Sequence, residues 1–213
     1  MNIAALVPVL DYGSVIIFAV TGALVASRAQ LDLVGFIFMA ALTAVGGGTL
    51  RDLILDRDMV FWVAQPAYVL IAAGCAVAVF WTAHLVESRY KLLIWLDSVA
   101  LAIAAAAGVG VALAGGFGPV VVVIMGVVTS TFGGLMRDVV GNELPLVLKQ
   151  GELYLTAAFG GALAMVGLIQ LGIAQTNAVL IGAVIVWILR AGSLIWCWKL
   201  PVYKSRPPKT MSK

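Results

Sequence analysis

Apolar runs of about 20 residues recur along the 213-residue chain, and this is the length that an α-helix needs to cross the hydrocarbon core of a bilayer. Hydrophobic residues make up 63% of the sequence and charged residues 11%, shares that lie outside the range of soluble domains. The runs lie at about 9–28, 33–55, 66–86, 93–114, 118–140, 152–172 and 177–198. The sequence therefore predicts an all-α integral membrane protein with seven transmembrane helices in one domain, 1–201, followed by a basic tail at 202–213.

Basic residues are distributed unevenly between the two ends of these predicted helices. One side receives only Arg57. The other side receives Arg28, Arg89, Lys91, Lys149, Lys199, Lys204, Arg206, Lys209 and Lys213. Because cytoplasmic loops are enriched in Lys and Arg, we expect the N-terminus outside the cell and the C-terminus in the cytoplasm. We therefore attribute the net charge of +3 to basic residues that set the membrane topology and contact anionic lipid head groups. Nucleic-acid binding is not needed to explain it.

Two similar polar strings interrupt the apolar sequence, GGGTLRD at 46–52 and FGGLMRD at 132–138. Their offset of 86 residues also aligns, without a gap, Asp11 with Asp97, Gly22 with Gly108, Thr43 with Thr129, Tyr68 with Tyr154 and Gly74 with Gly160. Each copy, 11–80 and 97–166, holds three predicted helices, and this odd number places two copies of one fold in opposite orientations, as inverted repeats. We expect repeat one at about 9–86, repeat two at about 93–172 and a seventh helix at about 177–198 outside the repeat.

Each polar string combines adjacent glycines with an Arg-Asp pair inside a predicted helix. Ionisable residues within a membrane are rare and mark functional sites. Adjacent glycines favour a kink, so we predict two helix breaks near the midplane whose carbonyls face a cation pathway. The alternative is that the glycines only let helices pack closely. The candidate pathway residues in the strings are Gly46, Gly47, Gly48, Thr49, Arg51, Asp52, Gly133, Gly134, Arg137 and Asp138.

The charges of the two strings need partners, because intramembrane charges commonly neutralise one another. Neighbouring residues on a helix point about 100° apart, so neither arginine has to bond the aspartate that follows it. We expect each arginine to pair with an acid of the opposite repeat. Such pairs either line the pathway or only lock the structure, and the sequence leaves both interpretations open.

Four further repeated residues support the strings. Asp11 and Asp97 are expected at the starts of the first and fourth helices, where a carboxylate either stabilises the helix N-terminus or concentrates cations at a pore mouth. Tyr68 and Tyr154 are expected near helix starts, either as interfacial aromatic anchors or as pore residues.

Three hydroxyl residues and one isolated arginine complete the candidates. Thr43, Thr129 and Ser130 precede the glycines by about one turn, and their hydroxyls either face a pore or bond to carbonyls of their own helix, which is the commoner arrangement. Arg190 lies in the seventh helix, which carries no acid. We expect it to reach an aspartate of the repeat core and to brace the site.

Enzyme chemistry has little support in this composition. His84 is the only histidine, and the two cysteines, Cys75 and Cys197, fall within predicted helices, where a thiol behaves as a small apolar group. The sequence has no metal-ligand set, no spacing of nucleophile and base, and no phosphate-binding loop with its lysine. It predicts a protein that is not an enzyme and that uses no cofactor.

The two strings in inverted three-helix repeats, followed by a helix with Arg190 and the ending WKLP at 198–201, resemble the prokaryotic trimeric intracellular cation (TRIC) channels. The resemblance covers 9–201. It implies a homotrimer with a pore in each protomer, lined by the kinked second and fifth helices with help from the first and fourth, that passes K⁺ and Na⁺ across the cell membrane. Phe132 stands where the first repeat has Gly46, so the two kinks are not expected to be equivalent.

Some bacterial relatives of this family are linked to the uptake of small amino acids, particularly glycine. The resemblance therefore also implies an alternative, a secondary transporter that rocks one repeat against the other. A passive scaffold is a third possibility, and the buried charges argue against it.

Overall fold

The structure is a computed structural model that describes residues 3–86, 88–149 and 152–201; within them the chain is helical and contains no strand. The predicted basic tail at 202–213 lies outside the described residues. The helices are α1 (Ile3–Arg28), α2 (Leu33–Ile54), α3 (Phe61–Ala64), α4 (Ala67–Thr82), η1 (Ala83–Leu85), α5 (Arg89–Ala114), α6 (Pro119–Val140), η2 (Leu146–Leu148), α7 (Leu155–Gln170) and α8 (Gln175–Trp196).

Local sequence explains where several of these helices begin. The Asp32 carboxylate accepts a hydrogen bond of 2.8 Å from the Gly35 amide and caps α2. Ser88 caps α5 in the same way, and Pro119 occupies the first turn of α6, where no backbone donor is needed. Six helices are long and apolar enough to span a membrane, and α7 is a shorter apolar helix of 16 residues. The predicted all-α fold class with seven membrane helices is confirmed.

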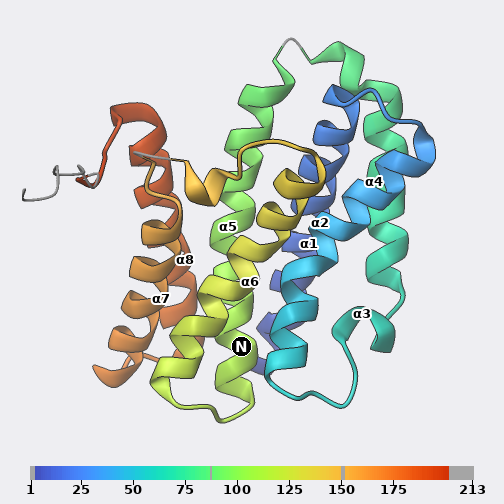
Figure 1. The fold of residues 1–213 in the computed structure, drawn as a ribbon. Helices are drawn as coiled ribbons and strands as arrows, with labels where there is room; N and C mark the ends of the chain where they lie inside the picture. Colours follow the sequence, from blue (N-terminus) through green and yellow to red (C-terminus); the bar gives the residue numbers. More distant parts are fainter. Residues whose placement is uncertain (1–2, 87, 150–151, 202–213) are drawn as a thin grey trace, which may run out of the picture.

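The duplication is visible in the helices themselves. At the offset of 86 residues, α1 coincides with α5 and α2 with α6 from the first residue to the last, and α7 begins two residues later than α4 would require. In Figure 1, α1, α5 and α6 lie side by side at the centre, α4 lies on one flank, and α7 and α8 lie on the other. Helix α8, which corresponds to the predicted seventh membrane helix, packs on α5 and α7. It has no counterpart beside repeat one within the described chain.

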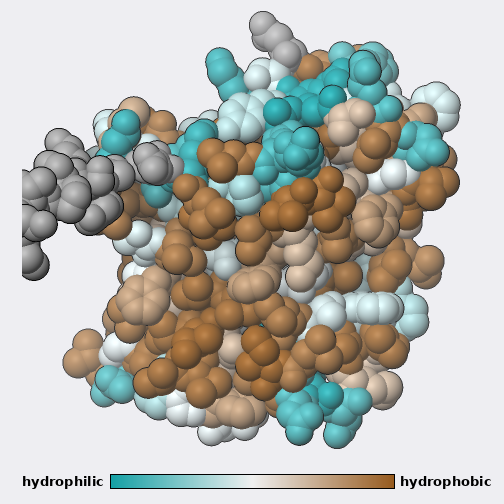
Figure 2. All heavy atoms as spheres, in the orientation of Figure 1, coloured by the Kyte–Doolittle hydropathy of each residue, from teal (hydrophilic) through white to brown (hydrophobic). Residues whose placement is uncertain are grey.

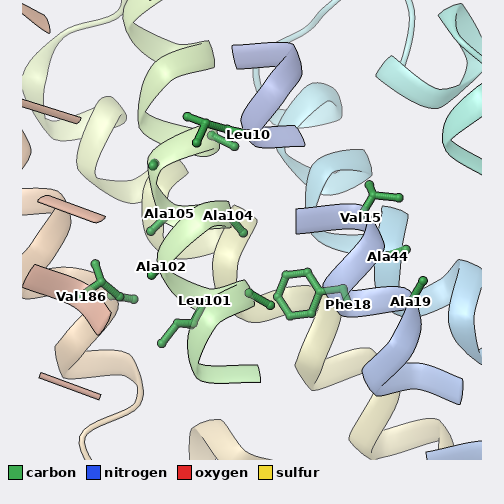
Figure 3. Close-up of a cluster of buried hydrophobic side chains, with 14 of the residues drawn as sticks. Leu10, Val15, Phe18, Ala19, Ala44, Leu101, Ala102, Ala104, Ala105 and Val186 are labelled. Carbon is green, nitrogen blue, oxygen red and sulfur yellow. The ribbon is translucent and has the colours of Figure 1, made fainter. Parts of the chain in front are cut away.

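Apolar side chains both fill the centre and cover the outside. Phe18 points from α1 towards α5, the helix that carries Leu101, Ala104 and Ala105 (Figure 3). The small buried residues of α5 let the central helices approach closely. On the face shown in Figure 2, hydrophobic residues cover the middle, and hydrophilic residues gather at both ends, most densely at the upper end. This pattern is that of a helical bundle surrounded by lipid.

Candidate functional site

The Arg-Asp pair of the first string is the centre of a buried ion-pair network. Arg51 is fully buried, and its Nε donates to Asp52 Oδ1 at 2.7 Å. Its Nη1 donates to Asp11 Oδ1 on α1 at 2.9 Å. Arg57 adds a longer bond of 3.2 Å to Asp52, and the Phe61 ring covers the Arg51 guanidinium at 5.3 Å. One arginine therefore bridges α1 to the carboxylate at the end of α2.

The second string repeats this network on the other half of the molecule. Arg137 Nε donates to Asp138 Oδ1 at 2.8 Å, and its Nη1 donates to Asp97 Oδ1 on α5 at 2.7 Å. The same Nη1 also donates to Thr21 Oγ1 of repeat one at 3.0 Å. Arg137 and Asp97 are fully buried, so this copy is enclosed within the bundle.

The pairing settles the partners of both arginines and corrects one prediction. Each arginine bonds the aspartate that follows it, because its long side chain bends back until Nε reaches the neighbouring carboxylate while Nη1 extends to the next helix. The expected pairing with acids of the opposite repeat is wrong, since both acidic partners come from the arginine's own repeat. Thr21 is the contact to Arg137 from the other repeat, and its aligned position in repeat two is Ala107.

Asp11 and Asp97 do not begin their helices, and that prediction is wrong. The first and fourth spans extend further towards the N-terminus than expected, so Asp11 lies in the third turn of α1 and Asp97 at the same place in α5. A carboxylate at that depth cannot cap a helix. Both instead accept hydrogen bonds from the buried arginines.

The second carboxylate oxygen of each motif aspartate holds the segment that follows its helix. Asp52 Oδ2 accepts a hydrogen bond of 2.8 Å from the Phe61 amide at the start of α3. Asp138 Oδ2 accepts one of 2.9 Å from the Leu146 amide at the start of η2. Each string therefore fixes a helix, a neighbouring helix and a connecting segment at one point.

The glycines do not interrupt their helices, and the predicted breaks are wrong. Both α2 and α6 are continuous α-helix through the glycine positions. A Cβ on Gly47 would meet the Thr129 carbonyl, and one on Gly133 would meet the Thr43 carbonyl. The two helices thus cross in backbone contact, because each presents a glycine to a backbone carbonyl of the other. This is the alternative in which the glycines let helices pack closely.

The remaining glycines of the strings lie against side chains. A Cβ on Gly46 would lie 2.8 Å from Met136 Sδ, and one on Gly48 would lie 2.6 Å from Phe61 Cε1. A Cβ on Gly134 would lie 3.0 Å from the Tyr154 hydroxyl. Gly22 and Gly108 are packing glycines, since each lies against the backbone and a threonine of the following helix, whereas Gly74 faces open space.

The hydroxyl residues bond to their own helices. Thr43 Oγ1 donates to the Met39 carbonyl and Thr129 Oγ1 to the Met125 carbonyl, both at 2.6 Å. Ser130 donates to the Gly126 carbonyl at 2.8 Å. Thr49 donates to the Val45 carbonyl and accepts a hydrogen bond of 2.9 Å from Trp62 Nε1. Their oxygens keep a free lone pair, so they remain available as acceptors.

A small cavity of about 10 Å³ lies beside the first string, and this volume suits about one water molecule. It extends from Asp11 and Ser14 of α1 to Gly47 of α2 and Thr129 of α6. The cavity therefore joins candidates of both repeats, and repeat one contributes most of its lining.

The two tyrosines are buried, so the prediction of interfacial anchors is wrong. Tyr68 stacks on Tyr12 with ring centroids 4.1 Å apart and packs edge-on against Phe61 at 4.8 Å. Tyr154 precedes α7 and is 2% exposed. Its ring lies under the Arg190 guanidinium at 5.0 Å.

Arg190 pairs with Glu152, which is not among the residues predicted for the site. Its Nη2 donates to Glu152 Oε2 at 2.7 Å, so the expected contact with an aspartate of the repeat core is wrong. Partial burial alone would raise the pKa of Glu152, but hydrogen bonds from Lys149 and Arg190 outweigh it and lower the pKa. The repeat gave no signal for this pair, because Glu152 aligns with Pro66 and α8 aligns with nothing.

The two ends of the site differ in charge. Arg57 of repeat one aligns with Glu143 of repeat two, so the duplication contains a charge reversal. Glu143 accepts a hydrogen bond of 2.9 Å from Arg28 and borders a cavity of about 310 Å³ together with Tyr90 and Lys149. The aligned cavity, of about 360 Å³, is lined mainly by apolar residues beside Arg57.

Known proteins resemble this chain over nearly all of its helical part. A sequence family described as glycine transporter matches twice, at residues 8–84 and 94–170, once for each repeat. The UPF0126 inner membrane protein YadS of Escherichia coli strain K12 is 35% identical over 199 residues, which cover 91% of this chain and 94% of that protein. A UPF0126 membrane protein of Vibrio cholerae is 33% identical over 204 residues, covering 93% of this chain and 83% of that protein.

Solved structures share the fold. The TRIC trimeric intracellular cation channel orthologue from Rhodobacter sphaeroides is 48% identical with a TM-score of 0.87, covering 90% of this chain and 98% of that one. A second structure, described in connection with conductance through TRIC cation channels, is 28% identical with a TM-score of 0.83, covering 94% and 98%. The membrane helices and the inner-membrane relatives together make this chain a multi-pass membrane protein.

Proposed function

This chain belongs to the sequence family described as glycine transporter and to the prokaryotic TRIC channel family, and on that premise we propose that it is a channel for monovalent cations. Potassium and sodium are the proposed ions. The proposed pore lies within each protomer and is lined by α2 and α6, with contributions from α1 and α5. We propose no enzymatic reaction, because the similar solved structures are of channels.

The observation that carries this proposal is the cavity at the crossing of α2 and α6. It contains the carboxylate of Asp11 and lies against hydroxyl residues of both helices, Thr43 and Thr129. Oxygen ligands of this kind replace the hydration shell of a monovalent cation. The network of Arg137 carries one positive and two negative charges, which also favours a cation over an anion, whereas Arg57 balances the second aspartate in the network of Arg51.

The proposed assembly is a homotrimer of a single channel domain, 1–201, in the cell inner membrane. The description of the Rhodobacter orthologue as trimeric supports this assembly. The basic residues at the ends of α1 and α5 support an orientation with the N-terminus outside and the C-terminus in the cytoplasm. Membrane lipids are then the other partners of the chain.

A second candidate function is the transport of a small solute such as glycine. The description of the matching sequence family favours it, and inverted repeats are common in secondary transporters. The two candidates differ in their kinetics, because a channel passes ions down a gradient without saturating at low concentration, whereas a carrier saturates with its solute.

Purified protein in proteoliposomes separates the two candidates. We expect a K⁺ gradient to drive rapid efflux through the wild-type protein, with no dependence on added glycine. Saturable uptake of labelled glycine in the absence of K⁺ efflux would replace the channel by the carrier.

A further inference from the structure

The second ion-pair network contains buried polar atoms that no group in the described chain satisfies. These atoms are Asp97 Oδ2, Arg137 Nη2 and Tyr154 Oη, with Arg190 Nε and Nη1 beside them. All four side chains belong to residues that are at most 2% exposed. Buried polar groups without partners are rare, and a bound molecule is a common explanation for them.

Two of these atoms and the Asp97 carboxylate lie close together beside Gly134. The position of a Gly134 Cβ is 3.0 Å from Tyr154 Oη, 3.4 Å from Asp97 Oδ1 and 3.6 Å from Arg137 Nη2. The Arg190 guanidinium lies over the ring of the same tyrosine, 5.0 Å from its centroid. Unsatisfied atoms of α6 and of the residue before α7 therefore lie within a few ångströms of the Asp97 carboxylate on α5.

The chemistry of the set selects the bound molecule. Arg137 Nη2 is a donor, Asp97 Oδ2 is an acceptor, and the tyrosine hydroxyl is both. A bare cation in this position would be repelled by the Arg137 guanidinium, and an anion would be repelled by the Asp97 carboxylate. Water donates and accepts, and buried waters typically make about three hydrogen bonds to groups of this kind.

The first network does not offer the same space. Phe61 covers Arg51 and lies against Gly48, and Tyr12 stacks on Tyr68. The residue that replaces Phe61 as backbone donor in repeat two is Leu146, and Ser98 aligns with Tyr12. Both replacements lack a ring. Repeat one accordingly leaves one buried side-chain atom without a partner, Arg51 Nη2.

The helix outside the repeat closes this space from one side. Arg190 of α8 bonds Glu152, and Ser193 Oγ accepts a hydrogen bond of 2.9 Å from the Leu153 amide. These two contacts fix the segment that carries Tyr154. We propose that Asp97, Arg137 and Tyr154 enclose a bound-water site, and that Arg190 and Glu152 seal it. A place for this water on the ion pathway rests on the proposed function, whereas the water site itself does not.

A tyrosine-to-phenylalanine pair tests the site by the sign of its effect on stability. In a dry site, Tyr154→Phe removes an unsatisfied hydroxyl and raises the melting temperature of the protein. In a hydrated site, the same change takes a partner from the water, and we expect the melting temperature to fall by about 2 to 4 °C. The matched control is Tyr68→Phe, for which we expect a change of at most about 1 °C.

A rise or no change for Tyr154→Phe overturns the proposal. A crystal structure of the wild-type protein that resolves waters provides the second readout. We expect density within hydrogen-bond distance of Asp97 Oδ2 and Arg137 Nη2, and direct pairing of these side chains without such density overturns the site. If the wild-type protein carries no K⁺ current, the proposed function fails. The melting temperature of Tyr154→Phe and the crystallographic density still show whether the water site exists.

Discussion

At the scale of single residues, Arg51 and Arg137 contribute most to what is distinctive in this protein. Each is fully buried and bonds two carboxylates, one on its own helix and one on the neighbouring central helix. Burying charges is costly, but removing one partner from a buried network costs more, because the remaining charges are left without compensation. These arginines are therefore required for the fold before any contact with an ion is considered.

The first residue-scale prediction concerns Arg137. Arg137→Gln leaves Asp97 and Asp138 as uncompensated buried carboxylates, and we expect a loss of roughly 3 to 5 kcal/mol in stability. The control is Arg57→Gln, because the Arg57 side chain is 45% exposed and its pair with Asp52 contributes at most about 1 kcal/mol. Thermal unfolding in detergent measures both variants. Equal effects of the two substitutions would contradict the account.

The second residue-scale prediction concerns the crossing glycines. Gly47→Ala and Gly133→Ala each place a methyl group against a backbone carbonyl, and we expect each to destabilise the protein by roughly 1 to 3 kcal/mol. Gly74→Ala is the control, because a Cβ there meets nothing within 4 Å and alanine favours a helix. Melting temperatures should fall for the first two variants and hold or rise for the third.

The sequence identified the residues of the site better than their contacts. The repeated offset singled out both arginines and all four aspartates, because an intramembrane charge is improbable unless it has a use. It could not assign partners, since a flexible arginine side chain reaches either its neighbour or another helix. One signal was present: Asp11 lies 40 residues before Arg51, as Asp97 does before Arg137, and only aspartates of the same repeat keep that spacing.

At the scale of helices, the glycine strings show where sequence reasoning failed. Adjacent glycines weaken a helix in water, but within a bilayer no solvent competes for the backbone, so α2 and α6 keep their hydrogen bonds. The glycines act between helices and not within them. Helix ends were predicted within a few residues for most spans, and α1 began earlier than expected because apolar residues continue almost to the N-terminus.

The helix-scale prediction concerns the joint between α7 and α8. Glu152→Gln removes the charge that balances buried Arg190, and we expect a loss of about 1.5 to 3 kcal/mol and faster amide exchange at Leu153 and the start of α7. Glu143→Gln is the control, because its pair with Arg28 is partly exposed. Unchanged exchange in Glu152→Gln would show that α8 does not hold this segment.

The same joint has a defined pH dependence. The pKa of Glu152 is lowered in the folded protein, so the stability that its ion pair contributes is fully present above the ordinary glutamate pKa of 4.5. That contribution is lost as the pH falls through the lowered folded pKa. Thermal unfolding between about pH 6 and pH 3 should therefore show a smaller decline in Glu152→Gln than in the wild-type protein.

At the scale of the whole molecule, two copies of one three-helix unit face each other in opposite orientations and have diverged at their ends. The shared core is preserved down to paired hydrogen bonds, from Asp52 to Phe61 and from Asp138 to Leu146. The differences are the charge reversal between Arg57 and Glu143 and the added helix α8, which covers repeat two. The proposed channel thus has paired ion-pair networks in its centre and differs in charge at its two mouths.

The central claim is that this molecule passes monovalent cations through a pore of its own, and recording from the purified wild-type protein in planar bilayers tests it most directly. Under a K⁺ gradient, the account predicts discrete unitary currents whose reversal potential lies close to the K⁺ equilibrium potential. Bilayers that contain folded protein and show no unitary currents, or currents that reverse at the chloride potential, would contradict it.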